Sequence, residues 1–285
     1  MSPASGWVAH IALQLEPRAG RTVLARKQQR GPLTVQRAFY PEGAPCHLYL
    51  LHPPGGVVGG DRLAIETQVA AGAHALLTAP GAAKVYRSAG ALAEQYQQFA
   101  VADSGVLEWL PQESILFPGA RLDLKTKVAL QGRARFIGWE ILSLGRPVIG
   151  ERFDRGCATM GLRIERDGQP LLSERLRIGS DRSSQSELQG LPQIGLDGPS
   201  GLRGWPITAT LIATGASAPD LDAARAAMSA EPGFALGLTL LEDLLVARAL
   251  ADQVEPVMHC FRKLWRCLRP RLLGLEASAP RIWAT

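Results

Sequence analysis

Hydrophobic and polar residues alternate with a period of two along much of the chain. The clearest segments are Arg62–Val69, Leu122–Leu130 and Leu171–Ile178, where apolar side chains recur at every second position. Successive side chains of a strand point to opposite faces, so this pattern predicts half-buried β-strands. The turn dipeptide Asp167-Gly168 separates two apolar runs and is typical of a tight hairpin. Further short strands are expected at Cys46–Leu51, His74–Thr78, Gln95–Val101, Val106–Leu110, Ala134–Leu144, Thr159–Glu165, Ile207–Ala213 and Leu244–Leu250.

Two segments show a helical period instead. Ser217 and Asp220 form a capping box at the start of a helix that we predict at about 217–229. A second helix is predicted at about 256–269, with apolar residues on one face and basic residues largely on the other. Pro270 is expected to end this helix, because proline has no N–H for the helical hydrogen bond. The pattern therefore predicts an all-β-dominated fold of many short strands with two α-helices.

The segment Gly179–Gly204 follows neither period. It is rich in glycine, serine, proline and glutamine, which predicts a long loop. Loops of this length are commonly functional, so a functional role is one interpretation of this one.

The length of the chain allows one large domain or two small ones, and we expect a single domain over residues 1–285. Hydrophobic residues make up 46% and charged residues 20% of the chain, which is enough apolar material for a sizeable core. No apolar run reaches the roughly 18 residues that a membrane helix needs, and the N-terminus has no signal-peptide pattern. The cysteines are scattered without a C-x-x-C pair, which favours thiols in a reducing compartment. We therefore expect a cytoplasmic protein that does not bind a membrane.

A net charge of +5 raises the question of nucleic-acid binding. Val246–Thr285 contains seven Lys and Arg residues against three Asp and Glu residues. Basic residues are not interleaved with aromatic ones there, as they are on surfaces that stack on bases. A solvated helix face is the more common cause of such an excess, so no nucleic-acid partner is expected.

A glycine-rich stretch, His52–Asp61, resembles a phosphate-binding loop at first sight. Such a loop needs G-x-G-x-x-G spacing and a following helix whose N-terminus holds the anion. The spacing here is different, and the alternating segment from Arg62 follows. The stretch is better explained as a connection between strands, and no organic cofactor is expected.

Acidic residues occur at positions where the alternation places apolar side chains. Glu174 shares its face with Leu172 and Leu176, and Glu140 shares its face with Phe136. Glu108 lies in a segment that is apolar on both faces. An unpartnered carboxylate in an apolar interior costs several kcal/mol or takes up a proton. Two explanations remain open: internal pairing with arginine, or a cation or water-filled passage through the core.

Several motifs together resemble the UreD (UreH) family of urease accessory proteins. They run in order over nearly the whole chain, and together they are highly specific. Ala79 and Val85 depart from the family pattern, and neither is a proposed ligand. The motifs are His52–Asp61, Pro80-Gly81 with Lys84–Ser88, Leu107–Glu113, Gly145–Pro147 with Gly150-Glu151, Leu264-Trp265, Leu268–Pro270 and Pro280–Thr285.

The resemblance implies a non-enzymatic scaffold for urease maturation, with the strands wound in a helix-like, solenoidal arrangement. Members of the family bind UreF, which brings the GTPase UreG, and the assembly docks on urease apoprotein to deliver nickel. The nickel is bound transiently and passes through an internal tunnel lined by carboxylates. By motif, the corresponding residues here are Asp61, Glu140 and Glu174.

The final helix has two interpretations. Its basic face is either simply solvated or a contact surface for UreF, with Phe261, Arg262 and Arg266 as candidate residues.

The alternative function is a metal-dependent hydrolase that uses Asp61, His52 and the interior glutamates. It requires these side chains to meet in one open pocket.

Overall fold

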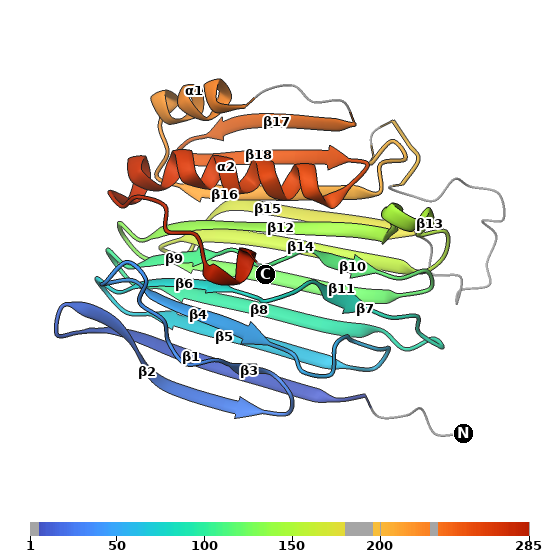
Figure 1. The fold of residues 1–285 in the computed structure, drawn as a ribbon, viewed down its shortest axis with the longest axis horizontal. Coiled ribbons are helices and arrows are strands. Elements are labelled where there is room, and N and C mark those ends of the chain that lie inside the picture. Colours follow the sequence, from blue (N-terminus) through green and yellow to red (C-terminus); the bar gives the residue numbers. More distant parts are fainter. Residues whose placement is uncertain (1–5, 180–195, 200, 229–232, 285) are drawn as a thin grey trace.

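Two β-sheets packed face to face form the body of the protein (Figure 1). The computed structural model describes residues 6–179, 196–199, 201–228 and 233–284. The first sheet contains β15 (Gln169–Gly179), β14 (Cys157–Arg166), β11 (Arg121–Leu130), β8 (Ala93–Val101), β5 (Arg62–Val69), β1 (Val8–Arg18) and β2 (Arg21–Arg30), in that order.

The second sheet follows the order β17 (Phe234–Leu241), β18 (Leu244–Ala251), β16 (Ile207–Thr214), β12 (Arg135–Arg146), β9 (Val106–Trp109), β6 (His74–Thr78), β4 (Cys46–Leu51) and β3 (Thr34–Val35). Three short strands branch from it: β7 (Ala83–Val85), β10 (Ser114–Leu116) and β13 (Glu151–Arg152). The helices α1 (Ala218–Ala227) and α2 (Val254–Leu273) complete the fold, with 3₁₀ turns at Pro147–Ile149 and Arg281–Ala284.

The chain passes back and forth between the two sheets. It runs from β4 in the second sheet to β5 in the first, then to β6, β8, β9, β11 and β12. Strands β5, β8, β11 and β14 pair in parallel, and so do β4, β6, β9 and β12. Each return therefore adds one rung to both sheets, which gives a β-solenoid-like stack of about four turns. The predicted all-β, solenoidal fold with two helices is confirmed.

Every strand expected from the alternation is present, with bounds that differ by a few residues at most. Asp167 and Gly168 have φ values of 50° and 80°, as a tight hairpin between β14 and β15 requires. The long strands β1, β2 and β17 were not predicted, and neither were the short strands β3, β7, β10 and β13. Most of the expected loop at 179–204 lies outside the described residues. Helix α1 ends at Ala227, two residues before the predicted end at 229.

The prediction that Pro270 ends the second helix is wrong. Helix α2 continues through Pro270 to Leu273 and ends at Gly274, which adopts the left-handed conformation with φ of 68°. Proline removes a single backbone hydrogen bond, and the buried contacts of Arg269 described below fix this last turn in place. Within the described ranges, neither helix is long and apolar enough to cross a membrane.

The second sheet is apolar on both faces. Side chains such as Phe136 and Leu142 of β12 pack into the core between the sheets. Their neighbours Trp139 and Ile141 point the other way, into a second core beneath the helices. Helix α2 covers this outer face, as Figure 1 shows. The alternation along β12 therefore decides which side chains face the gap between the sheets.

A buried ionic network joins α2 to the second sheet. The Arg269 guanidinium, fully buried, donates to Oε1 of Glu108 at 3.0 Å and to both oxygens of Glu42 at 2.6 and 2.7 Å. Trp265 donates to Glu108 at 2.5 Å. His74 hydrogen-bonds Glu108 at 2.7 Å. The carboxylates are thus held by an arginine more than 150 residues away in sequence.

The network keeps both acids ionised. Burial alone would raise the pKa of Glu42, but hydrogen bonds from His47 and Arg269 lower that pKa to about 2. The pKa of Glu108 is likewise lowered, because His74 and Arg269 outweigh the effect of complete burial. Glu108 is therefore a case of internal pairing with arginine, which is one of the two explanations left open by the sequence.

Replacing Arg269 by methionine should destabilise the protein strongly. R269M leaves Glu42 and Glu108 buried without their cation, which costs about 3–5 kcal/mol of the free energy of unfolding. Urea denaturation followed by circular dichroism measures this loss. R266M, at an exposed position on the same helix, is the matched control and should change stability by no more than about 0.5 kcal/mol. A loss below about 1 kcal/mol for R269M would contradict this account.

Candidate functional site

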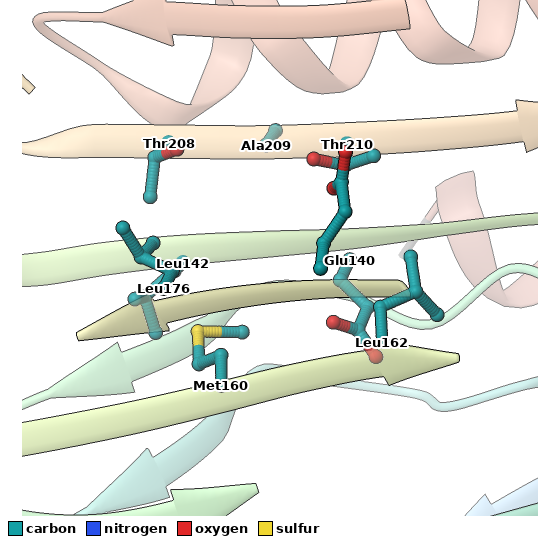
Figure 2. Close-up of a pocket in the computed structure, with 9 residues that line it drawn as sticks. Glu140, Leu142, Met160, Leu162, Leu176, Thr208, Ala209 and Thr210 are labelled. Atoms are coloured by element: carbon teal, nitrogen blue, oxygen red, sulfur yellow. The ribbon is translucent and has the colours of Figure 1, made fainter. Parts of the chain in front are cut away.

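A small cavity lies between the two sheets, near the edge formed by β15. Its volume is about 60 Å³, which is room for a few water molecules. Figure 2 shows Glu140 between the strand that carries Thr208–Thr210 and the strand that carries Met160 and Leu162. The cavity is lined by Glu140, Leu142, Met160, Leu162, Glu174, Leu176, Thr208, Ala209 and Thr210.

Strand register explains why these side chains meet. In the second sheet, Glu140 lies beside Thr210, which lies beside Arg248 of β18. Residues directly opposite one another on paired strands point to the same face. The same rule aligns Thr126, Leu162 and Glu174 in the first sheet. We call the six residues Glu140, Thr210, Arg248, Thr126, Leu162 and Glu174 the cross-gap row.

Glu140 is held by a hydroxyl group, and in the described part of the chain no ion pair joins it to a basic side chain. It hydrogen-bonds Thr126, whose hydroxyl is also 3.2 Å from Oε1 of Gln97. The single proton of Thr126 cannot go to both oxygens. The shorter contact is the one in which the Thr126 hydroxyl donates to the Glu140 carboxylate. Removal from water raises the pKa of Glu140, and the hydrogen bond donated by Thr126 opposes that rise without cancelling it.

Glu174 is held differently. It forms an ion pair with Arg248, which crosses from β18 in the second sheet to β15 in the first. Side-chain exposure is 30% for Glu174 and 51% for Arg248, so the pair stands at the solvent edge of the gap. The parity prediction is confirmed for both glutamates, because each faces the gap and both line one cavity.

Asp61 lies elsewhere in the fold. It is buried, and its two oxygens accept the backbone N–H groups of Trp7 at 2.8 Å and Val58 at 2.9 Å. Along the register it is four residues and four strands from the position of Glu174, which places the two roughly 20 Å apart. The structure therefore does not bring Asp61 to the cavity that holds the two glutamates.

The glycine-rich stretch before Asp61 has a structural explanation. Val57 donates its N–H to Lys84 at 2.7 Å and accepts from Tyr86 at 2.8 Å. A Cβ at Gly59 would approach the Ser88 side chain to 2.1 Å, so only glycine allows the two segments to pack this closely. The glycines allow two loops to pack closely. They do not form an anion-binding loop, because a strand and not a helix follows them.

The described residues do not assemble the hydrolase site that the alternative function requires. Burial lowers the pKa of His52, and the charge of Asp61 opposes that shift, so these two are neighbours. The cavity glutamates are remote from them by the register given above. Within the part of the chain that the structure describes, no three His, Cys, Asp or Glu side chains are arranged to hold a metal ion.

The candidate partner residues of α2 differ in accessibility. Phe261 is fully buried beneath the helix, with its ring 6.2 Å from that of Trp139, so its side chain is a core residue in this structure. Arg262 is half-buried, and its guanidinium lies 4.7 Å from the centre of the Trp283 ring. Arg266 is exposed. A partner contact on this face remains a prediction. Of the three candidate residues, only Arg262 and Arg266 have side chains that a partner could reach.

The cavity offers oxygen ligands, but too few of them for tight binding of a cation. Two carboxylates and the threonine hydroxyls are hard ligands that suit a hydrated divalent cation, whereas a closed site would need more protein ligands. Thr126, Thr210 and Arg248 were not predicted as parts of the site. Thr210 and Arg248 do alternate with apolar neighbours, but only the register between strands shows that they meet Glu140 and Glu174.

Comparison with known proteins adds independent information. Residues 8–284 match the family model described as UreD urease accessory protein. The chain is 48% identical over 283 residues to the urease accessory protein UreD of Azoarcus sp. (strain BH72), covering 98% of this chain and 95% of that protein. It is 46% identical over 280 residues to the urease accessory protein UreD of Pseudomonas entomophila (strain L48), with 98% and 95% covered.

The raised pKa of Glu140 predicts a pH-dependent effect of the variant E140Q. Above the unfolded-state pKa of about 4.3, the folded protein keeps a proton that the unfolded chain has lost, so the wild type loses stability as pH rises through the folded pKa. Glutamine mimics the protonated acid and avoids this loss. The stability of E140Q relative to wild type should therefore grow between pH 4 and pH 8, as measured by urea denaturation.

E242Q, on the exposed turn between β17 and β18, controls for the general effect of removing one carboxylate. A difference between E140Q and wild type that stays constant over this pH range would contradict a proton held on Glu140.

Proposed function

The chain belongs to the UreD urease accessory protein family, and from this premise we propose that it is a non-enzymatic scaffold that passes nickel toward urease. In this proposal it binds UreF, and through UreF the GTPase UreG, and docks on urease apoprotein. Nickel is the cargo of the process and is bound only in transit.

The observation that carries the proposal is that Glu140 and Glu174 line one cavity in the gap between the sheets. They come from different sheets and are separated by 34 positions in sequence. Register aligns Glu174 with Thr126, and the hydrogen bond of Thr126 to Glu140 joins the two sheets at this level. A purely structural core would be expected to fill this level with apolar side chains, as it does elsewhere between the sheets.

The chemistry of the cavity suits transit. A divalent cation that keeps several of its waters can contact a carboxylate on each side without a closed shell of protein ligands. Such a site binds weakly and releases quickly, as a passage requires. Ligation also needs ionised carboxylates, so binding should weaken as pH falls.

Asp61 enters the proposal as a separate point along the passage. Each of its oxygens already accepts one backbone N–H, and each retains a second lone pair for a passing cation. The basic face of α2 enters the proposal as the contact surface for UreF, through the accessible groups of Arg262 and Arg266.

The double variant E140Q/E174Q tests the passage. Co-expressed with urease and the other accessory proteins at limiting nickel, it should lower the nickel content of urease at least about tenfold, the scale on which altered metal surroundings act. Nickel per urease active site is measured by elemental analysis, together with urease activity. The matched control E66Q/E242Q removes two carboxylates from exposed positions and should leave nickel delivery unchanged.

Co-purification of the double variant with UreF separates the two roles. Retained UreF binding with lost nickel delivery supports a passage within the scaffold. Full urease activation by E140Q/E174Q would contradict the passage, and loss of UreF binding would show that the substitutions disturb the scaffold itself.

A further inference from the structure

Arg248 is a basic side chain placed where the proposed cargo is a cation. It is the one charged residue of β18, whose other gap-facing residues, Leu244, Val246 and Leu250, are apolar. Its register neighbours are Thr210 on β16 and Gly237 on β17. A Cβ built at Gly237 would meet nothing within 4 Å, so the side of Arg248 away from the cavity is open. The guanidinium therefore stands at the outer end of the cross-gap row.

The Arg248 guanidinium forms an ion pair with Glu174, one of the two carboxylates that line the cavity. Glu174 is paired with Arg248, whereas Glu140 is held by the neutral hydroxyl of Thr126. A carboxylate that neutralises an arginine is a poorer ligand for a cation, because the two positive charges compete for it and repel each other. Arginine stays protonated throughout the accessible pH range, so a change of pH does not remove this competition.

The pair is also easy to separate. Arg248 has a half-exposed side chain, and water can solvate the guanidinium when it leaves Glu174. Exposed ion pairs hold together only weakly, so a divalent ion can displace the arginine, and the arginine can displace the ion in turn. The fold thus supplies an internal competitor at the edge of the cavity.

We infer that Arg248 is a positioning residue that keeps the cavity low in affinity, by holding Glu174 until a divalent cation displaces it and by recapturing Glu174 when the cation leaves. This inference rests on the proposed function, because it assumes that cations reach the cavity. It goes further in assigning release to a residue of this chain.

The test is Ni²⁺ titration of the tag-free, full-length chain by isothermal calorimetry. R248Q removes the competitor, so Ni²⁺ should bind about two- to fivefold more tightly, the range expected for a half-exposed pair. R248K keeps a cation without the planar fork and should return the affinity toward wild type. The matched control R175Q removes the same charge beside Glu174 in sequence but on the outer face, and should leave the affinity unchanged.

A mutant cycle with E174Q separates this inference from the proposed function. If Arg248 acts through Glu174, E174Q weakens Ni²⁺ binding, and R248Q has no further effect in the E174Q background. Weaker binding in E174Q without tighter binding in R248Q would overturn the role of Arg248 and leave the passage standing. Unchanged affinity in both single variants would overturn both ideas, and equal tightening by R175Q would reduce the effect to general electrostatics.

Discussion

The strict two-residue alternation along stacked strands is the constraint on which the site depends. In a β-solenoid, hydrogen bonding sets the register between each strand and the next. A side chain that faces the gap is therefore flanked by the aligned side chains of the two neighbouring strands. Glu140, Thr210 and Arg248 share one level because three strands of the second sheet are in register. The cross-gap row is therefore aligned by the backbone hydrogen bonds of the sheets, and no specialised loop is needed to position it.

Three carboxylates that lie on apolar faces of the sheets nevertheless have three different states. Glu108 is fully buried and stays ionised because Arg269 and His74 surround it. Glu140 has a hydroxyl partner and a raised pKa, while Glu174 meets an arginine at the solvent edge. Inward placement alone thus says nothing about role. The partner on the opposite element decides whether a buried acid is structural or available to a cation.

Local pattern was sufficient for most of the fold. Alternation located the strands because half-buried strands carry that period in their own sequence, and β1 could have been found in the same way from Ile11, Leu13 and Leu15. The end of α2 could not be predicted from local pattern. The contacts that hold its last turn join Arg269 to Glu42 and Glu108, which are far away along the chain. The site divides in the same manner. Parity identified two glutamates, but their partners depend on register between strands.

The proposed passage for a metal ion must bind the ion less tightly than the site that receives it. The cavity meets this requirement by omission as much as by composition, because the described residues around it supply two carboxylates and no third strong ligand. The two carboxylates are also engaged before any ion arrives, one with a hydroxyl and one with a guanidinium. An ion that enters must displace existing interactions, and those interactions re-form when it leaves. The low affinity and reversibility that the proposed function requires therefore follow from the same side chains that stabilise the empty gap.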